Sequence, residues 1–346
     1  MRCLTLADTL RKRGEKCSFI SRAHQGNLID LIAERGYAVV GLPKATSKMR
    51  RTFSKLTHAP WLGADWVTDA EQTRHALGKE IVDWLIVDHY ALDHRWESVI
   101  RAACKRIMVI DDLADRRHDG DLFLDQNYGS SPVRYEGLLP EYCKQLHGPQ
   151  YALLKPEYSE RLKGSVARTS GIRRVLIYFG GGEDRDDLTG MALQAFIAPK
   201  LANIELDIIV GAAYAHKSSL EDTATQRGHT AIHSQLPDLA NLMASADLAI
   251  GAGGATTWER CCLGLPSIVI SVADNQRPAC EALAAEGMIE YLGERNSITT
   301  AQFRDRVLAL ISEPEALSRL SAHGMALVDG EGTYRVVEVL NCFRLN

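Results

Sequence analysis

Short apolar, β-rich runs alternate along this chain with segments whose apolar positions recur at helical spacing. The run Ser267 to Val272 is apolar without alternation, which is typical of a strand buried on both faces of a parallel sheet. The predicted strands are 17–21, 37–40, 84–88, 107–110, 121–125, 174–179, 205–210, 230–233, 247–250 and 267–272. The predicted helices are 4–12, 27–34, 69–81, 94–104, 187–196, 220–227, 239–244, 277–286, 301–312, 315–323 and 333–343. This succession predicts an α/β fold of parallel sheets with helices on both faces.

The pattern divides into two series. At 346 residues the chain is long for one domain and natural for two. Glycines and prolines interrupt the pattern between residues 128 and 156, and residues 163–174 have the composition of a linker. We therefore expect two Rossmann-like domains facing a cleft: an N-terminal domain over 1–150, a linker over 151–172 and a C-terminal domain over 173–330.

Composition narrows the possible partners. The formal net charge of −4 gives no general attraction to nucleic acid or to an anionic membrane. No apolar run approaches the ~20 residues of a membrane span, and the first residues contain no signal-peptide core. The eight cysteines are scattered, with no cluster at zinc spacing. We expect a cytoplasmic protein with reduced thiols and without a metal.

The stretch 246–276 contains the strongest candidate chemistry. A buried strand runs into Gly251, Gly253 and Gly254, and a helix follows that Thr256 or Thr257 can cap. Glycines let a ligand approach the backbone, and free N–H groups at a helix start bind anions. Glu259 can accept hydrogen bonds from ribose hydroxyls, and the amides Asn275 and Gln276 follow the next strand. The pattern favours a nucleotide diphosphate site. The alternative is an ordinary tight turn, since the glycine spacing is neither a Walker loop nor a dinucleotide fingerprint.

The start of the chain departs from the doubly wound pattern. Such a domain opens with a strand near the middle of its sheet, whereas this sequence opens with a helix. We therefore expect the strands 17–21 and 84–88 to flank an empty lane.

Seven separate segments together resemble the family of hydrolases that act on UDP-2,4-diacetamido-2,4,6-trideoxy-β-L-altropyranose in pseudaminic acid biosynthesis, a pathway of flagellin glycosylation. The matching segments are 1–7, 87–90, 110–116, 124–127, 179–181, 251–259 and 275–276. That family is similar in fold to GT-B glycosyltransferases. The resemblance therefore implies that a last helix, within 331–346, crosses back onto the first domain. It also implies metal-free hydrolysis with inversion, no cofactor and a UDP-sugar as the bound partner.

The resemblance also implies the site residues. The UDP-sugar would contact Gly180, Gly181, Gly251, Gly253, Gly254, Ala255, Thr256, Thr257, Glu259, Asn275 and Gln276. Tyr90 would line the reacting centre. The family's general base is the histidine of a Gly-x-Gly-His loop three residues before an Arg-Cys pair. Arg2-Cys3 is present here, and the loop would lie before Met1. This departure implies impaired hydrolysis. His89 is a weak candidate for the missing base, and the alternative interpretation is that it is a solvent-exposed loop histidine.

Two other functions stay open. One is a glycosyltransferase that uses a UDP-sugar donor, and the other is a UDP-sugar binding protein without catalysis. A lipid-linked acceptor would call for a membrane-docking patch, and only the basic segment 44–55 offers one. We expect a monomer without nucleic-acid or membrane partners.

Overall fold

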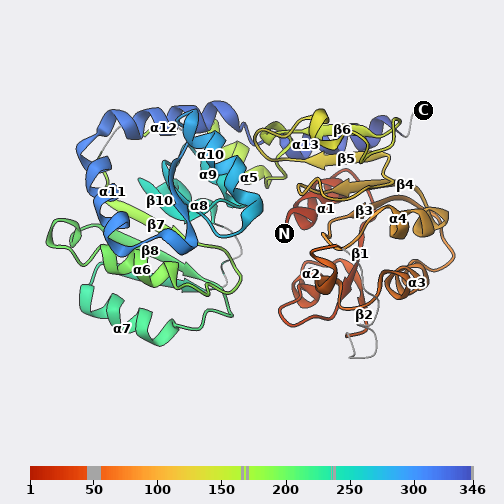
Figure 1. Ribbon diagram of the computed structural model, residues 1–346, viewed down its shortest axis with the longest axis horizontal. Coiled ribbons are helices and arrows are strands. Elements are labelled where there is room, and N and C mark those ends of the chain that lie inside the picture. The colour runs from red at the N-terminus through yellow and green to blue at the C-terminus, as the bar shows by residue number, and fades with distance from the viewer. Residues whose placement is uncertain (45–55, 165–166, 169–170, 235, 237–238, 344–346) are drawn as a thin grey trace. The chain divides into compact units, whose positions relative to one another are not determined.

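The computed structural model describes residues 1–44, 56–164, 167–168, 171–234, 236 and 239–343 (Figure 1). Nearly all of the basic segment 44–55 lies outside these residues. The chain forms two compact units, one of Met1–Leu153 with Thr333–Asn346 and one of Leu154–Gly332. Within the described part, no helix has both the length and the apolar character that crossing a membrane requires.

The first unit contains two separate parallel sheets. Its strands are β1 (Ser18–Arg22), β2 (Ala38–Leu42), β3 (Val82–Val87), β4 (Cys104–Ile110), β5 (Leu122–Asp125) and β6 (Lys144–His147). Its helices are α1 (Arg2–Lys12), α2 (Ile29–Glu34), α3 (Trp66–Leu77), α4 (His94–Ile100) and α13 (Gly332–Cys342). β1 pairs with β2, and the other strands form a four-stranded sheet in the order β3-β4-β5-β6.

The two sheets of this unit meet at a break in strand pairing. Among the described residues, β1 is hydrogen-bonded only to β2 and β3 only to β4. The expected interruption between these strands is therefore present. Helix α1 packs on both sides of it: Leu6 contacts the core of the four-stranded sheet, whereas Leu4 and Ala7 pack with Ile32 and Tyr37 beside the two-stranded sheet.

The last helix completes the first unit. Val336, Val337 and Leu340 of α13 are buried against Met108 and Leu122 of the four-stranded sheet. Figure 1 shows α13 beside β5 and β6. The expected crossover of the C-terminal helix to the first domain is confirmed.

The second unit is built on one six-stranded parallel sheet in the order β12-β11-β10-β7-β8-β9. Its strands are β7 (Arg174–Tyr178), β8 (Glu205–Val210), β9 (Thr230–Ser234), β10 (Leu248–Ala252), β11 (Ser267–Ser271) and β12 (Glu290–Glu294). Its helices are α5 (Pro156–Leu162), α6 (Leu188–Ala195), α7 (Lys217–Arg227), α8 (Ala240–Ser245), α9 (Thr256–Cys262), α10 (Arg277–Ala285), α11 (Thr300–Ser312) and α12 (Pro314–Leu327). β10 and β11 are buried along their whole length, which explains their unalternating apolar sequence.

Several element predictions need correction. The helix predicted to reach Cys104 ends at Ile100, and Cys104 already begins β4. β6 and β12 were not predicted because these sheet-edge strands are partly exposed and polar. α5 lies inside the stretch interpreted as a linker. The predicted threonine cap of α9 is wrong: Ala255 is the N-cap residue, and no side chain caps the helix.

We predict that Leu340→Ala destabilises the first unit selectively. Leu340 is 2% exposed, and truncating a fully buried leucine typically costs about 2–5 kcal/mol. Denaturant unfolding should show an earlier transition for the first unit and an unchanged one for the second. Leu340→Met, which conserves volume, should cost less than about 1.5 kcal/mol. Equal shifts of both transitions would contradict the assignment of α13 to the first unit.

Candidate nucleotide-binding site

The connections of the second sheet reverse direction between two neighbouring strands. From β7 the chain moves outward to β8 and β9, and it then returns to β10 on the other side of β7 before moving to β11 and β12. In open parallel sheets, ligands bind beyond the carboxyl ends of the strands at such a switch point. The loop after β7 contains Gly180 and Gly181, and the turn after β10 contains Gly253 and Gly254. The fold thus brings together the two glycine segments identified in the sequence.

Two of the three glycines around β10 are required by packing. A Cβ at Gly251 would overlap the carbonyl oxygen of Tyr178 and lie 2.5 Å from Nη1 of Arg260. A Cβ at Gly253 would overlap Sγ of Cys280. These glycines therefore hold the turn against β7 and α10, whether or not a ligand binds.

Gly254 is different, because no packing explains it. The only neighbour within 4 Å of an added Cβ would be Nε2 of Gln276, at 3.6 Å. Gln276 Oε1 accepts a hydrogen bond of 3.0 Å from the backbone N–H of Val272, which orients the side chain. Its NH₂ group is therefore on the side of Gly254. The backbone at Gly254 and the amide donors of Gln276 border the same open space.

The first turn of α9 begins beside this space, and two of its backbone N–H groups are already bonded within the turn. Thr257 N–H bonds to the carbonyl of Gly254, and Trp258 N–H bonds to that of Ala255. No side chain of the described residues caps the helix. Ala255 is exposed and Thr256 partly so, whereas Thr257 is buried and accepts a hydrogen bond from Arg260. The accessible part of the predicted segment is therefore 254–256, whereas the Thr257 side chain lies in the interior and contacts Arg260.

Glu259 and Tyr178 lie close to each other at this end of the sheet. Burial and the negative charge of Glu259 both raise the pKa of the Tyr178 phenol. Tyr178 ends β7, and Glu259 lies in the first turn of α9, so the pair spans the switch point. Asn275 and Gln276 lie in a short 3₁₀ helix, Asp274–Gln276, after β11.

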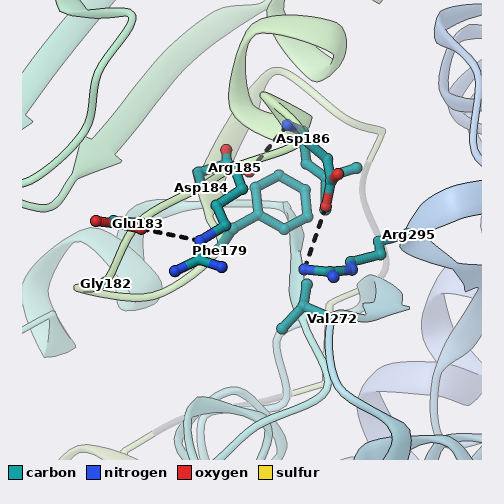
Figure 2. Close-up of a pocket in the computed structure, with 9 residues that line it drawn as sticks. Phe179, Gly182, Glu183, Asp184, Arg185, Asp186, Val272 and Arg295 are labelled. Carbon is teal, nitrogen blue, oxygen red and sulfur yellow. Dashed lines mark hydrogen bonds and ion pairs between the residues drawn. The ribbon is translucent and has the colours of Figure 1, made fainter.

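The loop after β7 forms a second, acidic pocket, shown in Figure 2. Asp184 accepts hydrogen bonds from the N–H groups of Leu188 and Thr189, and Asp187 accepts one from Gly190. The first-turn donors of α6 are thus already satisfied by carboxylates of the protein itself. The two arginines of the pocket are also paired, Arg185 with Glu183 at 2.9 Å and Arg295 with Asp186 at 3.3 Å. These paired groups make the pocket a poor site for an anion.

In the first unit, Tyr90 belongs to a polar and aromatic cluster at the carboxyl end of its sheet. Burial and the charge of Asp112 raise the pKa of Tyr90. Its ring lies 5.6 Å from that of His58 and 6.1 Å from that of Trp61, between ring centroids. Asp112 accepts a hydrogen bond of 2.8 Å from Asn127. This cluster and the glycine turns belong to different units.

A salt bridge from α1 reaches the same sheet end. Arg2 bonds both carboxylate oxygens of Asp88, at 2.6 and 3.0 Å, and Cys3 donates to Asp88 at 3.2 Å. Burial opposes ionisation of Asp88, but the charge and hydrogen bonds of Arg2 outweigh it and lower the pKa of this carboxyl. Asp88 is thus held as a carboxylate beside the Arg2-Cys3 pair.

His89 is poorly placed to act as a general base. Its Nδ1 accepts a 3.0 Å hydrogen bond from the backbone N–H of Ala91. The neutral ring therefore carries its proton on Nε2 and has no free lone pair for a water molecule. Burial also lowers the pKa of His89, which favours this neutral form. Among the described residues, no three His, Cys, Asp or Glu side chains are grouped to hold a metal ion.

Two residues of the candidate nucleotide site, Tyr178 and Arg260, were not identified from the sequence. Tyr178 ends the apolar strand β7, and aromatic residues are common in such strands, so its type gives no functional signal. Arg260 is 2% exposed between Glu259 and Cys261 in α9. The sequence signal that could have indicated a buried Arg260 is that it is an arginine among the apolar residues Trp258, Cys261 and Cys262.

Solved structures with similar folds place the chain in a class. MurG of Acinetobacter baumannii is 12% identical with a TM-score of 0.61, over 98% of this chain and 95% of that chain. UGT89C1 of Arabidopsis thaliana, in a complex with UDP, is 12% identical with a TM-score of 0.64, over 97% of this chain and 95% of that one. The fold is therefore GT-B-like, as the sequence predicted.

Family and sequence comparisons concentrate on the second unit. Residues 175–328 match the glycosyltransferase family 28 C-terminal domain. The spore coat polysaccharide biosynthesis protein SpsG of Bacillus subtilis is 25% identical over 56% of this chain and 57% of its own length. The UDP-N-acetylglucosamine--N-acetylmuramyl-(pentapeptide) pyrophosphoryl-undecaprenol N-acetylglucosamine transferase of Rickettsia africae is 29% identical over 45% of this chain and 44% of its own. The chain thus spans about half the length of these curated relatives.

We predict that Gly254→Val abolishes UDP binding with little loss of stability. Its Cβ region is open in the protein, so the side chain would occupy the space offered to the ligand. Calorimetric titration with UDP measures binding, and thermal unfolding measures stability. Gly253→Ala is the contrasting variant: its Cβ would overlap Cys280 and lower the unfolding temperature. Normal UDP binding by the folded Gly254→Val protein would show that the turn is assigned wrongly.

Proposed function

We propose that this protein binds a UDP-sugar in its second unit and cleaves the bond between the sugar and the diphosphate, as an enzyme of polysaccharide biosynthesis. The observation on which this rests most is the open space at Gly254, bordered by Gln276 and the uncapped start of α9. It lies within the segment that matches the family 28 domain. The names of relatives that use UDP-N-acetylglucosamine support a UDP-linked donor.

The residues suggest how the nucleotide is held. Backbone N–H groups at 254–256 and the amide of Gln276 can donate to the diphosphate, for which water would otherwise be the partner. The Glu259 carboxylate accepts hydrogen bonds from the ribose hydroxyls. Gly180, Gly181 and Asn275 complete the proposed contacts. Because UDP is a good leaving group, stabilising its charge can replace a general acid.

For the reaction itself we propose hydrolysis of a UDP-linked diacetamido-trideoxyhexose, with inversion and without a metal. The sequence segments shared with that hydrolase family support it, and Tyr90 would belong to the sugar side. The hydrogen bond that His89 accepts from Ala91 argues against His89 as the base. The proposal therefore requires another proton acceptor.

Transfer of the sugar to an acceptor is the second candidate. It is favoured by the family 28 match and by the names of the Rickettsia relatives, which are transferases. Incubation with UDP-sugars, followed by NMR, separates the two reactions. Release of UDP and free sugar without an acceptor supports hydrolysis, and release only with an acceptor supports transfer. Saturable binding without release would contradict both and leave a binding protein.

We predict that Glu259→Ala weakens UDP binding by about 1.5–3 kcal/mol, because it removes a charged acceptor for ribose hydroxyls. Titration with UDP and with uracil tests this, since only UDP contains the ribose. Glu281→Ala is the matched control, an exposed glutamate on α10 of the same unit. Unchanged UDP affinity in Glu259→Ala would remove Glu259 from the site.

A further inference from the structure

Arg260 lies beneath the turn that the proposed function assigns to the diphosphate. It belongs to α9, where Trp258, Cys261 and Cys262 are also buried, and its own exposure is 2%. Long basic side chains usually keep their charged end in water, whereas the guanidinium of Arg260 is buried. Such burial requires a reason, because removing a guanidinium from water costs several kcal/mol.

The guanidinium connects the two ends of the glycine turn. Nη2 donates to the carbonyl of Ala252, the last residue of β10, at 2.8 Å. It also donates to Oγ1 of Thr257, near the start of α9, at 3.0 Å. Nη1 lies where a side chain at Gly251 would begin. Arg260 therefore spans the turn from below and fixes its ends relative to each other.

Among the described residues, no carboxylate forms an ion pair with Arg260. Of the buried arginines that the structure describes, Arg22 pairs with Asp69 and Arg116 pairs with Asp111. No such ion pair is found for Arg260 within the described segments, and Nε has no hydrogen-bond partner there. The nearby thiols do not compensate, since burial raises the pKa of Cys261 to about 12 and that of Cys280 to about 11. Burial lowers the pKa of Arg260, and the charge of Glu259 is the smallest of the contributions that oppose this shift.

We propose that Arg260 is a positioning residue that also supplies the buried positive charge for the diphosphate of the bound nucleotide. The inference rests on the proposed function and adds to it the source of the anion's countercharge. The neutral N–H groups of the turn contact the anion, and the guanidinium acts on it through the turn. Burial makes this attraction stronger than at a surface and shields it from salt.

If Arg260 acts through its charge, it should contribute to the binding of the diphosphate and not to the binding of the nucleoside. Uridine lacks the anionic group, so its binding should not depend on the charge. UDP contains it, so the ratio of UDP to uridine affinity reports the electrostatic contribution. A residue that only maintained the shape of the turn would leave this ratio unchanged in Arg260→Gln, which keeps an amide donor for Ala252 but lacks the charge.

We therefore predict that Arg260→Met lowers the affinity for UDP by about 10- to 100-fold, as expected for a charge several ångströms away at an effective dielectric constant near 20. Uridine affinity should change less than about twofold by the argument above. Arg260→Lys keeps the charge and should retain most of the UDP preference. Arg277→Met is the matched control, an arginine at the start of α10 whose side chain is 52% exposed. Calorimetric titration of each folded variant provides the affinities.

The outcomes are distinct. If the unaltered protein does not bind UDP, the proposed function fails. If it binds UDP but Arg260→Met keeps the same ratio of UDP to uridine affinity, the inference about Arg260 is overturned and the function stands. Should Arg260→Met not fold, Arg260→Gln, which keeps an amide donor for Ala252, takes its place. A ratio unchanged in Arg260→Gln would overturn the inference equally.

Discussion

Crowding of the backbone at the carboxyl end of β10 is the constraint on which the candidate site depends. The Tyr178 carbonyl and the Arg260 guanidinium occupy the space beside Gly251, and Cys280 occupies the space beside Gly253. Neither position can accept a side chain without displacing a neighbouring strand or helix. The turn is therefore confined by β7, α9 and α10, whereas Gly254 is partly exposed and Ala255 is exposed.

The two glycine loops at the switch point differ in electrostatics more than in shape. Carboxylates of the protein fill the donors at the start of α6, and the arginines beside them are neutralised. At α9 no side chain of the described residues caps the helix, and the turn lies over the buried Arg260, for which the described segments contain no ion pair. Sequence inspection favours the turn at 251–254, because Glu259, Asn275 and Gln276 follow it, but it does not show that the donors after β7 are already bonded. The partners of the polar groups distinguish them.

The apolar strands could be predicted because their residue types indicate burial, whereas the crossover of the last helix was implied by the resemblance to a family of GT-B-like fold. β6 and β12 could not be predicted, since edge strands contain polar residues that also suit loops. Residues 251–276 were recognised as the candidate site, but the separate tasks of Gly251, Gly253 and Gly254 were not. Those tasks depend on Tyr178 of the neighbouring strand β7, on Arg260 of α9 and on Cys280 of α10. These contacts are made by the fold and are not visible in the sequence around the turn.

The discontinuous first unit has a consequence for how the protein is made. Residues Met1–Leu153 leave the ribosome before the second unit, but the apolar surface around Met108 and Leu122 is covered by α13, which is synthesised after the second unit. Throughout translation of the second unit, the first therefore exposes a sheet face that no part of the nascent chain yet covers. Such surfaces recruit chaperones or aggregate. The order of synthesis thus allows the second unit to complete its core before the first, although its synthesis begins later.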